Sequence, residues 1–496
     1  MWAACLPAVA GGSESQLAES SELLVSCRDT SAKLCPFVDF DTWNYRTPDP
    51  RVELIRNRGF AASGLFWSSA VTSTRPVQLE LQEVLPRLRP GSQLVIADGE
   101  WQNVELTIRA NGSWDRPILV RPETPHGVHF TGRTQLRFVG SNLIVADLVL
   151  RNGRYASAAT VVGLGNSRER CDSCVALELD MQDLNAGSSR LHYLGVRGKD
   201  VTVAYSRFGG ARSPGHYVYD SNPTEADRPA RLHLLNNLFY DRGALSDENG
   251  YELLQMGESR VQAQSMFGRI EGNVFRDAMV PHADTELVTI KSSDWLIRGN
   301  TFQNTLGDLT LRSANRVLVQ QNSFLGGGSL SASGVRVHGA GHAVVGNFFY
   351  KNANPAPAQT ARGEAYYYSV VIPAGTVEEV SDGEAGIPVA KNVVVADNVF
   401  YDGLYNVHLG SFFPSYPIMP RGITVTNNLI RTEQHSPIFV LPRGSEPTFL
   451  CQNDIDGNVL QGTSGLQGFL ADSRNPTIHP TLSESLPPPA FVPSAP

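Results

Sequence analysis

The sequence predicts an all-β fold, a right-handed parallel β-helix in which short strands stack coil upon coil. The first reason is an Asn-x-Phe repeat, whose steps mostly measure 22 to 36 residues, the length of one coil. The second is a series of short segments rich in Val, Ile and Leu, which Gly, Asn and Pro interrupt without long helical stretches between them. The copies of the repeat begin at Asn237, Asn273, Asn300, Asn322, Asn347 and Asn398.

The predicted elements follow one another in a simple order. Residues 1–75 lack periodicity and are predicted to form an irregular extension. Residues 77–88 carry apolar side chains at helical spacing, so we expect a helix that caps the open end of the solenoid. The β-helix itself is expected over residues 76–465, and a Pro-rich tail over residues 466–496. Its first strands are predicted at 93–97, 104–109, 118–121, 143–145 and 148–150.

Two segments break the repeat, at residues 211–229 and 352–392. Both are polar and contain tyrosines, and the second has an acidic stretch from Glu378 to Glu384. Long insertions in solenoids emerge on one face and often shape a binding surface. We therefore expect these two segments to border the functional site.

The composition limits the class of partner. The 496 residues have a net charge of −8, which argues against nucleic acid and anionic membranes but leaves room for an acidic polymer bound by a local basic groove. No apolar run approaches the roughly 20 residues of a membrane span. The apolar start, Met1 to Gly12, faintly resembles a signal peptide, so a secreted, extracellular or periplasmic protein is expected. The sequence says nothing of the oligomeric state.

The six cysteines favour structural roles. Cys171 and Cys174 have CxxC spacing, but no further suitably spaced zinc ligands stand nearby, which favours a local disulfide or buried thiols. Cys27 and Cys35 flank a polar loop and could form a second small disulfide.

Lys291 and Arg312 form the strongest candidate for a reaction centre. Lys291 precedes its repeat Asn by 9 residues and Arg312 precedes the next one by 10, so the two should stack on neighbouring coils about 4.8 Å apart. A lysine can be tuned to a neutral base by burial and cationic neighbours, whereas arginine stays charged. By the same count Arg336, 11 residues before Asn347, should extend the column, with His338 beside it on the same strand face.

Three oxygen donors precede Lys291 in the sequence. Asn249, Asp284 and Glu286 occupy similar positions after their repeat asparagines, so they should converge on adjacent coils. Oxygen-only ligands suit a hard cation such as Ca²⁺, although a solvated acidic patch explains the same spacing. Glu286 and Lys291 have opposite strand parity, so they share a face only if a bend or bulge lies between them.

Several motifs in one order resemble polysaccharide lyase family 6, the group of alginate lyases and chondroitinase B. The resemblance covers roughly residues 78–465. Its motifs are Ala97 to Glu100, Pro117 to Glu123, Asn249-Gly-Tyr251-Glu252, Met256 to Ser259, Glu286 to Ser292, Arg298 to Phe302, Gly307 to Arg312 and Gly334 to Arg336.

The resemblance implies a parallel β-helix and a lyase that breaks a uronate glycosidic bond by β-elimination. It implies Lys291 as the base that takes the C5 proton and Arg312 as the acid or electrostatic partner at the leaving oxygen. It further implies Ca²⁺ on Asn249, Asp284 and Glu286. Substrate contacts are expected at Tyr251, Glu252, Arg336 and His338.

Four features depart from the family pattern. Ser313 follows Arg312 where the family usually has His, Gln255 stands where Arg is common, and Asp284 replaces a Glu; the N-terminal extension is also unusual. The leading expectation is a lyase acting on alginate, with dermatan sulfate as the second substrate. A non-catalytic β-helix that binds carbohydrate is the alternative from another class.

Overall fold

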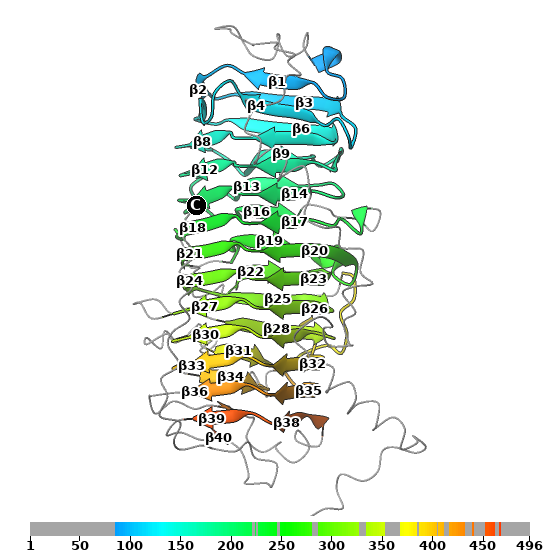
Figure 1. Cartoon of the computed structure of the whole chain (residues 1–496), viewed down its shortest axis with the longest axis vertical. Helices are drawn as coiled ribbons and strands as arrows, with labels where there is room; N and C mark the ends of the chain where they lie inside the picture. Colours follow the sequence, from blue (N-terminus) through cyan, green and yellow to red (C-terminus); the bar gives the residue numbers. More distant parts are fainter. Residues whose placement is uncertain are drawn as a thin grey trace, which may run out of the picture.

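The protein forms a parallel β-helix that runs coil by coil from β1, at the top of Figure 1, to β40 at the bottom. Strands of successive coils pair in parallel, as β22 does with β25. The computed structural model describes residues 85–220, 224, 227–245, 249–279, 286–326, 334–352, 368–383, 386–403, 405–410, 416–431, 439–440, 452–461 and 466–467.

Each coil contributes one strand to each of three stacks, which we call faces 1, 2 and 3, and one short extra strand, β10 (Cys171–Asp172), pairs with β6. Face 1 contains β3 (Glu105–Asn111), β6 (Gln135–Ser141), β9 (Ala159–Leu164), β13 (Leu191–Val196), β16 (Val218–Asp220), β19 (Leu254–Met256), β22 (Glu286–Ile290), β25 (Asp308–Asn315), β28 (Val335–Ala340), β31 (Tyr368–Ile372), β34 (Tyr405–Leu409), β37 (Phe439–Val440) and β40 (Leu466–Gln467). Face 2 contains β1 (Gln93–Ile96), β4 (Ile118–Pro122), β7 (Leu143–Ala146), β11 (Val175–Leu177), β14 (Thr202–Ala204), β17 (His233–Leu235), β20 (Ser265–Glu271), β23 (Ser293–Arg298), β26 (Val317–Gln320), β29 (Ala343–Val345), β32 (Lys391–Ala396), β35 (Arg421–Thr426) and β38 (Asp454–Asp456). Face 3 contains β2 (Gly99–Gln102), β5 (Val128–Thr131), β8 (Val149–Arg151), β12 (Asp180–Gln182), β15 (Arg207–Gly209), β18 (Leu238–Arg242), β21 (Val274–Met279), β24 (Thr301–Leu306), β27 (Ser323–Leu325), β30 (Phe348–Tyr350), β33 (Val399–Tyr401), β36 (Leu429–Arg431) and β39 (Val459–Gln461).

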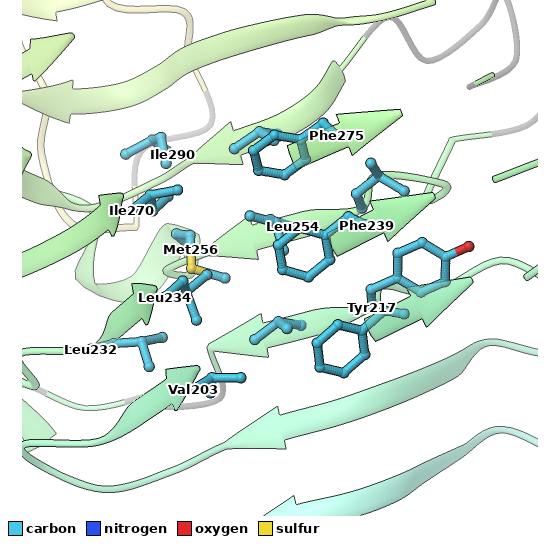
Figure 2. Packing of buried hydrophobic residues seen from close by; sticks show 14 of the residues in the cluster. Val203, Tyr217, Leu232, Leu234, Phe239, Leu254, Met256, Ile270, Phe275 and Ile290 are labelled. Atoms are coloured by element: carbon cyan, nitrogen blue, oxygen red, sulfur yellow. The ribbon is translucent and has the colours of Figure 1, made fainter. Parts of the chain in front are cut away.

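The Phe of the repeat fills the interior beneath face 3. Phe275 stacks on Phe302 at 4.5 Å between ring centroids, and Phe302 stacks on Phe324 at 4.7 Å. Leu254 and Met256 of face 1 are fully buried in the same core, part of which Figure 2 shows. Their burial leaves the alternate residues of face 1 pointing outward, which is where Arg312, Arg336 and His338 lie.

The Asn of the repeat forms a buried hydrogen-bonded ladder between faces 2 and 3. The Oδ1 atom of Asn300 accepts from the backbone N–H of Asn273 at 2.9 Å and from its Nδ2 at 3.0 Å. The Nδ2 of Asn300 donates in turn to the Ile270 carbonyl at 2.8 Å and to Asn322 Oδ1 at 2.9 Å. The side chain thus satisfies polar groups at a bend that water does not reach.

We expect Asn300→Leu to lower the free energy of unfolding by about 3–5 kcal/mol, because it orphans several buried polar groups in a nearly shape-matched substitution. Chemical denaturation monitored by circular dichroism measures the loss. Asn111→Leu, at an exposed end of β3, is the matched control and should change stability little. Equal effects of the two substitutions would show that the ladder contributes nothing special.

Two expectations outside the site need correction. The predicted capping helix over residues 77–88 is not supported: Leu85–Arg87 form one 3-10 turn, and residues 77–84 lie outside the described residues. The segment 211–229 is not simply an insertion, because Val218–Asp220 form β16 and the Tyr217 ring lies in the core.

The cysteine expectation is confirmed where the structure describes it, because Cys171 and Cys174 form a disulfide. Cys27 and Cys35 lie outside the described residues, as do residues 1–75 and most of the tail. Within the part of the chain that is described, no helix has the length and apolar character needed to cross a membrane.

Candidate active site

Lys291 and Arg312 lie side by side on face 1, as the repeat predicts. Ile290 of β22 pairs with Leu311 of β25, so the residues that follow them, Lys291 and Arg312, stand on neighbouring coils. Both side chains are partly exposed, Arg312 to 35%. A substrate can therefore reach both groups from outside the coil.

Glu286 joins this pair because a bulge turns it outward. The register shifts between Glu286 and Val288, which is the irregularity that opposite strand parity requires. Its Oε1 lies 3.2 Å from Arg312 Nη1 and 3.2 Å from Arg336 Nη2, and its Oε2 accepts a 2.7 Å hydrogen bond from Thr289 Oγ1. One carboxylate therefore bridges two guanidinium groups from different coils.

The charges around Glu286 fix its protonation state. Burial alone would raise the pKa of its carboxyl, but the positive charges of Arg312, Arg336 and Lys291 and the Thr289 hydrogen bond together lower that pKa to about 2. Glu286 is therefore ionised at any pH at which the protein would work.

Arg336 does not extend the Lys291–Arg312 column, which corrects the prediction from spacing. It pairs in register with Thr310, and its side chain, 6% exposed, passes Thr310 Oγ1 at 3.0 Å to reach Glu286. It also lies 3.4 Å from Asp308. Arg336 therefore supports the site from behind rather than adding a third exposed cation.

His338 is the residue that continues the column. The register shifts again after Leu311, so that Arg312 and Ser313 together stand opposite the single residue His338. His338 shares its strand face with Arg336, as predicted, but it is only 1% exposed. This burial speaks against direct contact with a substrate.

The other two expected substrate contacts are also internal. Tyr251 is fully buried, with the Arg242 guanidinium 5.1 Å from its ring centre. Glu252 is 3% exposed, and its Oε2 lies 3.4 Å from Nδ1 of the buried His216. Both residues line the coil below Lys291 and Glu286, so their observed contacts are structural.

Sequence reasoning missed Thr289, Thr310 and Asp308, which hold the two arginines and the carboxylate together. Thr310 and Asp308 fall inside a motif that pointed to Arg312 alone. Thr289, Thr310 and Arg336 pair with one another on three successive coils, so an alignment of the coils on Arg336 instead of on the repeat Asn would have found the two threonines.

The three expected Ca²⁺ ligands differ in their surroundings. Asn249 is exposed, and Asp284 lies outside the described residues. Glu286 already interacts with two guanidinium groups and a hydroxyl, and a cation placed on it would be repelled by Arg312, Arg336 and Lys291. No group of three or more acidic, His or Cys side chains in the described residues is arranged to hold a metal. Among the described residues Glu286 is held by cations instead, and the Ca²⁺ site stays a prediction.

Acid should destabilise the protein through its buried histidines. His342 accepts from the Val317 N–H at 3.2 Å and has its other ring nitrogen 3.0 Å from the His338 carbonyl. Burial lowers the pKa of His342 from 6.5 to about 4, and the same cause lowers that of His408 to about 4. Because the unfolded chain then binds more protons than the folded one, stability falls as pH drops from 6.5 towards 4.

The expected loss is on the order of 3 kcal/mol for each fully buried histidine. Denaturation curves at neutral pH and near pH 4.5 measure it. His342→Gln should make the free energy of unfolding depend less on pH. If that dependence is unchanged, His342 does not cause the loss of stability in acid.

Known proteins resemble this chain along most of the solenoid. The model of a family described as chondroitinase B matches residues 76–475. A mannuronic acid specific polysaccharide family 6 lyase from the human gut microbiota is 19% identical, with a TM-score of 0.66 over 77% of this chain and 85% of that one. A mutant of the family 6 alginate lyase AlyGC is 20% identical, with a TM-score of 0.69 over 82% of this chain and 53% of that one. A family 6 polysaccharide lyase from Pseudopedobacter saltans is 20% identical, with a TM-score of 0.59 over 77% and 91% of the two chains. No curated protein matches significantly.

Proposed function

Because the chain belongs to the chondroitinase B family of polysaccharide lyases, within polysaccharide lyase family 6, we propose that it cleaves alginate by β-elimination at Lys291 and Arg312. The observation that carries this proposal is the placement of these two cations on adjacent coils, both partly exposed, with Glu286 holding Arg312. The reaction has two tasks, removal of the C5 proton and neutralisation of the substrate carboxylate, and a lysine and an arginine held in this way suit them.

The first task is to remove a weakly acidic proton. Lys291, in its neutral form, takes the C5 proton of a uronate, and the electron pair left behind forms the C4–C5 double bond. The bond from C4 to the glycosidic oxygen then breaks, that oxygen takes up a proton from water, and the proton held by Lys291 returns to the solvent. Arg312 donates the hydrogen bond that stabilises the leaving oxygen, from a position next to Lys291.

The second task is to neutralise the substrate carboxylate, without which the C5 proton is too weakly acidic. Arg312 and Arg336 bring two positive charges to the site, and Glu286 and Asp308 balance them; Lys291 adds a third positive charge only while it is protonated. The substrate carboxylate therefore depends on hydrogen bonds from the partly exposed Arg312 rather than on a net charge of the site. Arg336 contributes from within the protein, since it is buried.

We favour alginate as the substrate, because the similar structures include an alginate lyase and a mannuronic acid specific lyase. Dermatan sulfate, the second substrate expected from the sequence, is kept as a candidate because the matching family is described as chondroitinase B. Incubation with each polymer, followed by ultraviolet absorbance of unsaturated uronate ends, separates the two. Faster cleavage of dermatan sulfate would contradict the alginate proposal, and binding of both without absorbance would indicate a carbohydrate-binding protein.

We also propose that the protein acts outside the cytoplasm, where such polymers are found. The Cys171–Cys174 disulfide supports an oxidising compartment. Fractionation of the producing cells tests the location, and recovery only from the cytoplasm would contradict it.

A further inference from the structure

The connection between β31 and β32, described over residues 373–383 and 386–390, leaves the regular coil and packs against the site; we call these residues the strap. Its two arms pair with each other, since the Thr376 N–H donates to the Ile387 carbonyl at 2.8 Å and the Val389 N–H to the Val377 carbonyl at 2.9 Å. The base of the strap is held by Glu379, which lies 2.9 Å from Lys391. Figure 1 draws the strap in yellow beside the lower coils.

The tip of the strap is attached to a loop several coils away. The Asp382 carboxylate accepts from the Ala263 N–H at 2.8 Å and from Gln264 Nε2 at 2.8 Å, and the Gly383 N–H donates to the Ser259 carbonyl at 2.7 Å. Residues 259–264 connect β19 to β20, on the coil before Lys291. The strap and this loop therefore join across the coils that carry Lys291 and Arg312.

The strap also contacts the site directly, through His338. A ring N–H of His338 donates to the Pro388 carbonyl of the strap. Its Nδ1 is buried without a hydrogen-bond partner. Burial, followed by the charges of Arg336 and Arg312, keeps the pKa of His338 well below its ordinary value, so the ring is neutral and has one N–H to give.

The position of His338 relates it to Arg312. It stands opposite the Arg312–Ser313 bulge on the next coil, whereas Glu286 contacts Arg312 from the preceding coil. Ser313 stands where the resembling family usually has a histidine, and His338 places an imidazole beside the same arginine. Arg312 thus has a carboxylate on the preceding coil and, on the next coil, a ring that is hydrogen-bonded to the strap.

We infer that the strap is a positioning element for the reaction, which holds the His338 imidazole against Arg312 and depends on the attachment of Asp382. His338 and Asp382 are positioning residues, because neither touches the reacting atoms. The inference rests on the proposed lyase function, and it adds a dependence of that function on a segment outside the coil repeat.

The test uses an exposed residue whose loss leaves the core intact. Asp382→Ala should lower kcat by roughly tenfold with KM nearly unchanged, since small displacements of a catalytic group cost rate rather than binding. Asp382→Asn keeps an acceptor oxygen and should restore most of kcat. Asp115→Ala, which removes an exposed aspartate near the N-terminal end of the solenoid, is the matched control.

A double-mutant cycle separates positioning from general loosening. His338→Gln should lower kcat as well, and Asp382→Ala should cost nothing further in that background, because both act through one contact. If the loss of kcat in the double variant equals the product of the two single losses, the inference is wrong. An unchanged kcat in Asp382→Ala would also overturn it. His338→Leu serves as the second variant if His338→Gln does not fold.

Hydrogen exchange tests the strap independently of activity. In Asp382→Ala, amide exchange should rise in residues 375–389, in residues 259–264 and around His338. Faster exchange at the tip alone would refute the coupling to His338. A wild-type protein that cleaves no uronate polymer would remove the proposed function but would leave this exchange result interpretable.

Discussion

Lys291→Ala is expected to reduce lyase activity by about 10³-fold, because it removes the group that takes the C5 proton. The fold should survive, since Lys291 lies at a bend and its backbone N–H, which donates to the Met256 carbonyl at 2.7 Å, is kept. Initial rates of unsaturated uronate formation measure the loss, and thermal unfolding checks the fold.

Lys291→Arg distinguishes two possible roles of Lys291, as a base that accepts a proton and as a fixed positive charge. Arginine keeps the positive charge but does not release its proton in the usable pH range, so this variant should stay as inactive as Lys291→Ala. Lys351→Ala, on face 3, is the matched control and should keep full activity. Substantial turnover by Lys291→Arg would mean that Lys291 acts only through its charge.

The repeat allowed much of the fold to be predicted, because identical side chains on successive coils stack and their spacing is visible in the sequence. Asn300 and Phe302 lie in the two ladders that the repeat implies, and Lys291 lies beside Arg312. Counting from the repeat failed for Arg336. It lies 11 residues before Asn347, whereas Lys291 lies 9 residues before Asn300, so Arg336 stands two residues too early in its coil to join the column. His338, at 9 residues, has the same spacing as Lys291 and is the true neighbour of Arg312.

The rest of the site depends on features that carry no repeat. The bulge at Glu286 and the second one opposite His338 change which residues share a face, and no local pattern marks them. Arg336 reaches Glu286 across an intervening coil because its side chain is long. The strap has no periodicity, so its attachment through Asp382 could not be read from spacing.

Glu286→Gln is expected to lower kcat by about 10²-fold, because the neutral amide no longer holds Arg312 in place and leaves the buried Arg336 with less compensating charge. Stability should also fall, by about 3 kcal/mol, as expected when one partner of a buried ion pair is removed. Asp308 remains 3.4 Å from Arg336 and limits the loss. Steady-state kinetics and denaturation measure the two effects.

The response to calcium decides how Glu286 acts. As a positioning carboxylate, Glu286 makes the wild-type rate insensitive to exhaustive chelation, and added Ca²⁺ leaves Glu286→Gln as slow as before. As a metal ligand, it would make chelated wild-type protein resemble Glu286→Gln, with Ca²⁺ restoring the wild type better than Mg²⁺ because Mg²⁺ demands a tighter octahedral shell. The two guanidinium groups on Glu286 favour the first result, since an ion bound there would have to displace Arg312 or Arg336 and bear their repulsion. Recovery of activity by Ca²⁺ would overturn that reading and assign Glu286 to a metal site with Asn249 and Asp284.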